Sequence, residues 1–284
     1  MNYGKLRLLL KILRPKQWIK NLLILAAPIA GNALSANFER LLIAVLGFIL
    51  ASAFGYLIND WLDRERDRLH PRKRNRPFAS GELQIGSLII LSLTTLLCLS
   101  SICLILGKNF GIVVLIYLVI TISYSIKIKQ IPILELFWLA SGFLIRAIAG
   151  SVIIEENPTG WFIIVIYFGS IFLTLCKRRS EKESVSLTNS REVLSQYAVN
   201  FLEITSAVFA GVTLITYSLW VIQEHNNSYF AYLSIATFSC ALISYLLMSL
   251  KGKTESPEND LFSNKLVFSM GTITIGLLLA VFYR

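Results

Sequence analysis

Long apolar runs separated by short polar segments dominate the pattern along this chain. Nine of the runs are long enough to cross a bilayer as helices, which rise by about 1.5 Å per residue. They cover residues 18–35, 41–60, 86–106, 109–126, 132–150, 160–176, 203–222, 229–250 and 264–283. Each run is continuous and lacks the alternation of apolar and polar positions that marks a membrane barrel. The pattern predicts an all-α integral membrane protein with nine transmembrane helices in a single bundle.

The composition agrees with a membrane protein and excludes the soluble classes. Of the 284 residues, 55% are hydrophobic and 15% are charged, whereas soluble domains carry about 25% charged residues. The four cysteines lie in apolar runs without a CxxC pair, so we expect no zinc site and no disulfide framework. We interpret residues 1–284 as one polytopic domain of a multi-pass protein in the cell (inner or plasma) membrane.

Lys and Arg residues are distributed unevenly between the segments that join the apolar runs. The N-terminal segment and the loops 61–85, 127–131, 177–202 and 251–265 hold 23 of the 27. Because basic residues collect on the cytoplasmic side, we expect the N-terminus and these loops to be cytoplasmic and the C-terminus to be outside. The same rule accounts for the formal net charge of +10, so we expect no nucleic acid partner.

A cluster of acidic residues ends the second run, on the predicted cytoplasmic side. If the helix continues at about 100° per residue, Asp60, Asp63 and Asp67 share one face. Asn59 lies at the edge of that face, and Glu65 points away. Like charges on one face repel one another, so we expect a cation between them, and oxygen ligands of this kind favour Mg²⁺. The alternative is a solvated helix end neutralised by neighbouring arginines, namely Arg64, Arg66 and Arg68.

The motif Asn59-Asp60-x-x-Asp63-x-x-x-Asp67 resembles the first aspartate-rich motif of the UbiA superfamily of intramembrane prenyltransferases. The resemblance implies nine helices, an active site at the cytoplasmic side, and Mg²⁺ that binds a diphosphate. It makes Asp60, Asp63 and Asp67 the expected catalytic residues, and adds Asn59 to them as the expected metal ligands.

The second acidic motif of that superfamily is missing from its expected place. The matching loop holds Lys127 and Lys129, and only Glu135 could supply a carboxylate. We therefore expect these lysines to contact phosphate directly, in place of a second metal of the usual kind.

Four further stretches resemble one branch of the superfamily, the decaprenyl-phosphate phosphoribosyltransferases. They are residues 14–21, 70–81, 124–129 with 142–150, and 177–181. The resemblance implies that polar residues in these stretches bind substrate. Those residues are Lys16, Lys20, Asn21, Arg72, Lys73, Arg76, Tyr124, Lys127, Lys129, Arg146, Lys177, Arg178 and Glu181. Most of the basic ones also have a plain interpretation as insertion determinants, lipid contacts or partners of a helix dipole.

Arg146 is harder to explain without function, because it lies inside an apolar run. An unpaired charge there is costly, so we expect Arg146 to face the bundle and a counter-charge. Either Glu135 or a substrate phosphate would serve.

We interpret the chain as a Mg²⁺-dependent transferase in the membrane. It would move a 5-phosphoribosyl group from phosphoribosyl diphosphate to a polyprenyl phosphate lipid of the decaprenyl type and release pyrophosphate. Two alternatives stay open. One is a prenyltransferase that joins a polyprenyl diphosphate to an aromatic acceptor, and the other is a polyprenyl-phosphate transporter or binding protein. The carboxylates argue against transport, because they repel an anionic cargo. Self-association as a homo-oligomer is left open.

Overall fold

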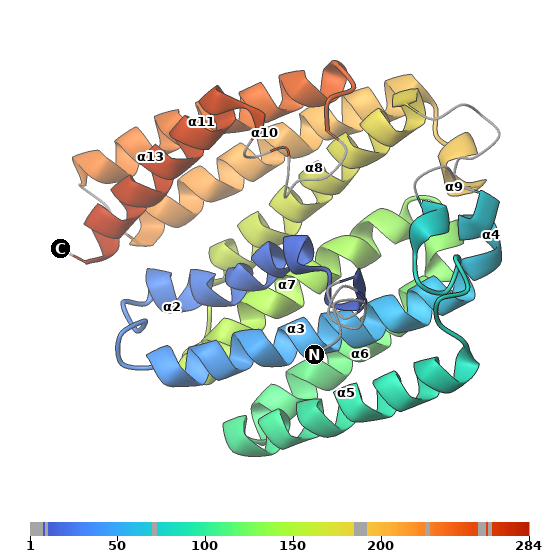
Figure 1. The fold of residues 1–284 in the computed structure, drawn as a ribbon. Coiled ribbons are helices and arrows are strands. Elements are labelled where there is room, and N and C mark those ends of the chain that lie inside the picture. The colour runs from blue at the N-terminus through green and yellow to red at the C-terminus, as the bar shows by residue number, and fades with distance from the viewer. Residues whose placement is uncertain are drawn as a thin grey trace.

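The computed structural model describes residues 8, 11–69, 73–184, 192–224, 228–254, 260 and 263–283. Within them every regular element is a helix, and the long helices pack beside one another (Figure 1). The prediction of an all-α membrane protein is confirmed.

Eight helices are long and apolar enough to span a membrane, and each overlaps one of the predicted runs. They are α3 (Phe38–Leu62), α5 (Ile85–Leu106), α6 (Lys108–Ile126), α7 (Leu134–Ile154), α8 (Gly160–Ser184), α10 (Val199–Glu224), α11 (Tyr229–Leu250) and α13 (Lys265–Phe282). Shorter elements join them: α4 (Arg64–Leu69), η2 (Lys73–Asn75), η3 (Ile128–Gln130) and α9 (Glu192–Ser195), where η marks a 3₁₀ helix.

The first predicted run is divided between two elements, η1 (Pro15–Leu25) and α2 (Ala26–Ala30). Neither is long enough to count as a spanning helix, so the count of nine is not confirmed. The segment nevertheless runs from one end of the bundle to the other. Arg14 contacts Asp60 near the C-terminal end of α3, and Gly31 lies against Glu156, just beyond the opposite end.

Close packing of backbones holds η1 in the bundle. A Cβ atom at position 150 of α7 would collide with the carbonyl oxygen of Ile24, so Gly150 lets η1 lie directly against α7. Small residues at such contacts let membrane helices approach closely. Ile24 then joins a fully buried cluster with Phe48, Phe110 and Ile153, which links η1 to α3, α6 and α7.

The outer helices present apolar side chains to the surroundings. In the spanning window of α5 only 11% of the residues are buried, and Leu97 and Leu104 are 70% and 85% exposed. An exposed apolar surface of this extent marks contact with a membrane. The arrangement therefore places lipid against α5 and keeps the polar side chains between the inner helices.

One predicted loop is shorter than expected, because α8 continues through the basic residues that follow the sixth run. The extension is stabilised by ion pairs one turn apart along the helix. Arg178 Nη1 lies 2.5 Å from Oε2 of Glu181, and Arg179 pairs with Glu183 in the same way. The expected break after residue 176 was therefore wrong.

Candidate active site

The acidic motif lies where α3 ends and α4 begins. Asp63 is the junction, with φ −92° and ψ 1°. Its N–H donates to the carbonyl oxygen of Asn59 at 2.9 Å, and its own carbonyl oxygen accepts from the N–H of Asp67 at 2.8 Å. The helical progression is therefore kept across the junction. Asp60 and Asp67 are buried, whereas the Glu65 side chain is 66% exposed and points away, as the periodicity predicts.

Two arginines from other segments neutralise the buried carboxylates. Nη1 of Arg76 donates to Oδ1 of Asp60 at 3.0 Å and to Oδ2 of Asp67 at 2.6 Å. Arg14, at the start of η1, pairs with the second oxygen of Asp60 and lies over the ring of Tyr56 at 4.6 Å. A single guanidinium nitrogen thus bridges two carboxylates of the motif.

A lysine from the second polar loop completes the neutralisation. Lys129, in η3, is 9% exposed, and its Nζ donates to Oδ1 of Asp63 at 2.6 Å. The same Nζ lies 3.5 Å from Oδ1 of Asn59. The second loop therefore supplies a cation to the first motif, which supports an active site built from both loops.

The nearest arginines along the chain have other partners. Arg64 lies over the ring of Trp61 at 4.0 Å, and Arg68 donates to Glu65 at 2.9 Å. No contact between these two arginines and the three aspartates appears in the described residues. Arg64 and Arg68 therefore do not neutralise the aspartates, contrary to the alternative of a solvated helix end.

Arg76 is held in place by the fold of its own loop. Phe78 is buried and packs edge-on against Trp61, with ring centroids 5.7 Å apart. It joins a buried cluster with Leu57 of α3 and Leu83. Hydrophobic packing of the loop against α3 thus brings the Arg76 guanidinium over the acidic motif.

A second polar network lies beside the first, at the start of α7. Arg178 of α8 donates to both oxygens of Glu135, at 2.7 and 2.6 Å, and both side chains are almost completely buried. Tyr124 lies between them, 3.4 Å from Glu135 and 3.2 Å from Arg178. Such a pair is stable in the interior only when its remaining groups are also hydrogen-bonded. Glu135 is therefore engaged by Arg178 and cannot serve as a free metal ligand in this arrangement.

The backbone between η3 and α7 contains a strained turn. Ile133 has φ 65° and ψ −55°, a region that β-branched residues rarely adopt, and the N–H of Leu134 donates to the carbonyl oxygen of Pro132 at 2.7 Å. The hydroxyl oxygen of Tyr197 accepts from the Ile133 N–H at 2.7 Å. Burial raises the pKa of Tyr197 to about 12, so the phenol is neutral at physiological pH. The turn sets the positions of Lys129 before it and Glu135 after it.

Arg146 lies deeper in the bundle and has only neutral partners in the described residues. It donates to Oδ1 of Asn21 at 2.8 Å, to the carbonyl oxygen of Gly142 at 2.8 Å, and to the hydroxyls of Ser52 and Tyr117 at 3.0 and 2.7 Å. A charge inside a membrane protein is expensive unless such groups surround it.

Of the two counter-charges considered for Arg146, Glu135 and a substrate phosphate, the structure excludes Glu135. Glu135 lies in the first turn of α7 and Arg146 is three turns further along, about 16 Å at 1.5 Å per residue. Glu135 pairs with Arg178 instead.

The other predicted substrate residues are more scattered. Lys16 and Lys127 are exposed, and Lys20 donates to Gln17 of its own helix. Lys73 belongs to η2, next to the Arg76 loop. Lys177 lies 3.8 Å from Glu181. Arg72 lies outside the described residues.

Sequence reasoning missed three residues of these networks as site residues. They are Arg14, Ser52 and Tyr117. Arg14 belongs to a basic stretch that was singled out, so its charge near the first run was a usable signal. Ser52 and Tyr117 stand in apolar runs, where nothing in the local pattern distinguishes them from packing residues.

Comparison with known proteins decides the family. The sequence profile of the UbiA prenyltransferase family matches residues 22–282. The chain belongs to the UbiA prenyltransferase family. It is therefore a multi-pass membrane transferase, and the resemblance seen in the acidic motif is confirmed.

Relatives within the family differ in how much of the chain they match. A decaprenyl-phosphate phosphoribosyltransferase from Mycolicibacterium smegmatis is 31% identical over 296 residues, covering 97% of this chain and 92% of that protein. A 4-hydroxybenzoate octaprenyltransferase from Shewanella frigidimarina is 33% identical over 126 residues, 42% of this chain and 43% of that protein. A UbiA homologue from Archaeoglobus fulgidus, solved with GPP and Mg²⁺, has the same fold, with a TM-score of 0.72, 18% identity, and coverage of 96% and 97%.

The acidic motif suits a divalent metal in the chemistry of its donors. Carboxylate and amide oxygens are the ligands that Mg²⁺ prefers. Within the described residues, however, no three acidic, His or Cys side chains already surround one point. The Arg76 guanidinium donates to Asp60 and Asp67, Arg14 pairs with Asp60, and Lys129 donates to Asp63. These carboxylates could hold a metal if the three cations moved away from them.

Proposed function

We propose that this UbiA-family transferase moves a 5-phosphoribosyl group from phosphoribosyl diphosphate to a polyprenyl phosphate and releases pyrophosphate. The observation that carries the proposal is the identity to the M. smegmatis decaprenyl-phosphate phosphoribosyltransferase along nearly the whole of both chains. The match to the S. frigidimarina octaprenyltransferase covers 42% of this chain, so it supports membership of the same family more than a shared substrate.

The acidic motif is the proposed metal site. Asn59, Asp60, Asp63 and Asp67 would hold Mg²⁺, and the ion when bound would neutralise charge on the departing pyrophosphate. In the reaction the bond from C1 of ribose to the diphosphate oxygen breaks, and a bond from C1 to an oxygen of the lipid phosphate forms. No general base is needed, because a phosphate monoester is already anionic near neutral pH.

The cations that now cover the motif are the proposed phosphate ligands. Arg14, Arg76 and Lys129 all lie within hydrogen-bonding distance of the carboxylates. If the carboxylates held a metal, these guanidinium and ammonium groups would be free to donate hydrogen bonds to phosphate oxygens of the donor. Charge-assisted contacts of this kind orient phosphate groups strongly. This exchange of partners gives the Lys129 loop a role without a second acidic motif.

Two further polar networks, around Glu135 and around Arg146, hold together the helices that surround the acidic motif. The Glu135–Arg178 pair, with Tyr124, joins the start of α7 to α8 beside the Lys129 loop. Arg146 and Asn21 join η1 to α7, and Arg146 brings a positive charge into the bundle. We propose that Arg146 favours the anionic lipid through this charge.

Product analysis tests the proposal. Purified protein is incubated with Mg²⁺, labelled phosphoribosyl diphosphate and a panel of polyprenyl phosphates. We expect a labelled lipid that requires the polyprenyl phosphate. Prenylation of 4-hydroxybenzoate from a polyprenyl diphosphate, without ribosyl transfer, would favour the conventional prenyltransferase. Binding of the lipid without any product would favour a transporter or binding protein.

A further inference from the structure

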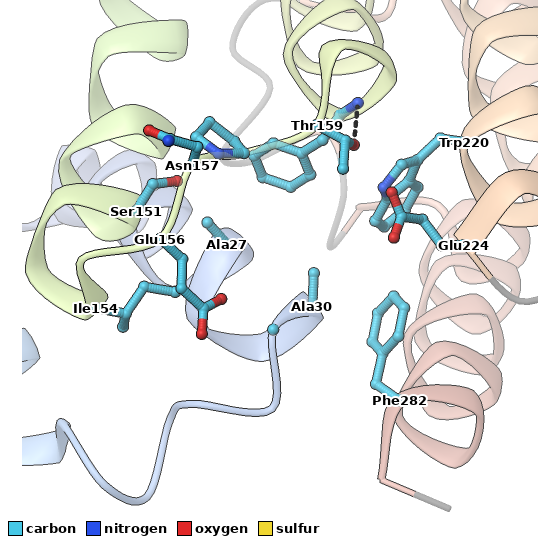
Figure 2. A pocket seen from close by; sticks show the side chains of 13 residues that line it. Ala27, Ala30, Ser151, Ile154, Glu156, Asn157, Thr159, Trp220, Glu224 and Phe282 are labelled. Carbon is cyan, nitrogen blue, oxygen red and sulfur yellow. Dashed lines mark hydrogen bonds between the residues drawn. The ribbon is translucent and has the colours of Figure 1, made fainter.

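A cavity lies at the end of the bundle opposite the acidic motif (Figure 2). Its volume is about 130 Å³, and it is open on one side. It is lined by α2, the end of α7, the segment between α7 and α8, the start of α8, and the last turns of α10 and α13. The helix α7 begins beside the Lys129 loop and ends at Ile154, which lines this cavity. The cavity is therefore separate from the proposed active site by the length of a spanning helix.

Two carboxylates line the cavity from different elements. Glu156 follows α7 and Glu224 ends α10, and Figure 2 shows them on facing sides of the space. In the part of the chain that the structure describes, neither carboxylate forms a hydrogen bond or an ion pair, and the lining contains no Lys, Arg or His. Neighbouring Glu155, by contrast, turns away and contacts Arg40 at 3.5 Å. Two negative charges without a counter-charge among the described residues attract a cation to the space between them.

A buried hydroxyl in the same wall also lacks a partner. Ser151 is 2% exposed, lines the cavity, and its Oγ has no hydrogen bond. Serines in helices usually donate to the carbonyl oxygen four residues earlier, as Ser141 does here. Figure 2 shows the Ser151 hydroxyl directed from α7 towards the cavity and Asn157. A buried polar atom without a partner is unfavourable, so a ligand that bonds to it is favoured.

The other walls are aromatic. Trp220 and Phe162 are buried, with ring centroids 5.7 Å apart, and Phe282 lies 5.8 Å from Trp220. Aromatic rings together with carboxylates recognise organic ammonium groups, because the ring face attracts the cation while its alkyl groups pack on the ring. A bare metal ion uses no aromatic wall and needs more oxygen ligands.

We propose that this cavity binds a small organic ammonium group. The charge lies between Glu156 and Glu224, an N–H of the ammonium donates to Oγ of Ser151, and the carbon atoms attached to nitrogen lie against Trp220. Because the cavity is at the ends of spanning helices, the ammonium can come from a lipid head group or from a free amine. The site does not depend on the reaction that the acidic motif performs.

Binding measurements on the purified full-length protein test the site. The probes are ethanolamine and choline, added as chlorides and matched with NaCl, and binding is measured by calorimetry. A second arm places the protein in nanodiscs of phosphatidylglycerol with or without phosphatidylethanolamine and counts retained lipids by native mass spectrometry. Saturable binding in the first arm identifies a free amine as sufficient, and selective retention of phosphatidylethanolamine identifies a lipid source. The proposal would be overturned if neither amine bound and no phosphatidylethanolamine were retained. It would also be overturned if CaCl₂, tested in the same calorimeter, bound and the amines did not.

Variants identify the site. Glu156→Gln combined with Glu224→Gln should weaken binding at least tenfold, whereas the matched control Glu155→Gln removes the same charge from the same segment and should leave it unchanged. Both glutamates are exposed and unpaired in the described residues, so the double variant should keep the apparent thermal midpoint of the wild type. Equal binding by the wild type and this folded double variant would show that the amine binds elsewhere.

Ser151→Ala adds a test of the ligand geometry. It should weaken binding of ethanolamine, which can donate an N–H, and leave choline, which cannot, unaffected. It should also raise the thermal midpoint of the ligand-free protein, because an unsatisfied hydroxyl is removed. An equal loss for both amines would contradict the proposed contact.

Discussion

The three aspartates of the acidic motif are expected to act as a unit. Asp60→Ala, Asp63→Ala and Asp67→Ala should each lower kcat by about 10²-fold or more, since each removes a carboxylate ligand from the proposed metal site and its charge from the reacting centre. Glu65→Ala is the control, because that side chain is 66% exposed and lies off the shared face. Its kcat should stay within about twofold. Comparable damage from Glu65→Ala in the ribosyl-transfer assay would contradict the assigned face.

Arg76 is predicted to compete with the metal. Its Nη1 bridges Asp60 and Asp67, so Arg76→Ala should tighten binding of Mn²⁺ to the substrate-free protein by about tenfold, the value of one charge-assisted hydrogen bond. The same variant should lose ribosyl transfer if Arg76 also binds phosphate. Mn²⁺ affinity is measured by electron paramagnetic resonance. Arg68→Ala, whose partner is the exposed Glu65, is the control and should not change it. Unchanged affinity in Arg76→Ala would show that the guanidinium is no competitor.

Part of this residue-level picture could be predicted from the sequence. The helical period places the aspartates on one face because it depends only on local geometry. The cations that cover them could not be assigned, since Arg14 and Asp60 are 46 positions apart and meet only through the packing of η1 on the bundle. The Arg178–Glu135 pair depends on long-range packing in the same way, so the sequence could not show that Glu135 pairs with Arg178 and not with Arg146.

At the scale of elements, the strained turn at Ile133 before α7 is expected to lower the stability of the protein while it positions Lys129 and Glu135. Ile133→Gly should raise the apparent thermal midpoint by about 2 °C, because it removes strain of about 1 kcal/mol at positive φ while the Ile133 side chain is 52% exposed. Tyr197→Phe should lower it, since the partly buried Ile133 N–H loses its hydrogen bond, a loss of about 1 kcal/mol. Thermal unfolding in detergent measures both. A lower midpoint for Ile133→Gly would mean that the turn is unstrained.

The helices themselves were largely predictable, because a membrane span must be apolar for its whole length. The run 86–106 and α5 (Ile85–Leu106) differ by one residue. The predicted runs and the observed helices differ where tertiary contacts or ion pairs determine the helix type or its end. The 3₁₀ geometry of η1 accompanies close contact with α7 at Gly150, and α8 extends past its apolar run because ion pairs one turn apart stabilise it.

At the scale of the whole molecule, the two ends of the bundle differ in charge. The end with the acidic motif also carries most of the Lys and Arg residues, whereas Glu156 and Glu224 lie at the other. We predict that a cysteine introduced at position 65 is protected from a membrane-impermeant label in intact cells, and that cysteines at the exposed positions 155–157 or 223–224 react. Reaction at position 65 from outside would reverse the orientation and remove the proposed site from the cytoplasm.

The fate of each phosphate of phosphoribosyl diphosphate tests the proposed function most directly. The purified protein is given Mg²⁺, decaprenyl phosphate and donor labelled with ³²P either at the 5-phosphate or at the β-phosphate, and Asp63→Ala serves as the inactive control. Phosphoribosyl transfer predicts that the 5-phosphate label enters the lipid phase and that the β-phosphate label stays in water as pyrophosphate, in equal amounts. Label from the β-phosphate in the lipid would contradict it. So would a lipid phase free of both labels, if the same protein prenylates 4-hydroxybenzoate when it is given a polyprenyl diphosphate.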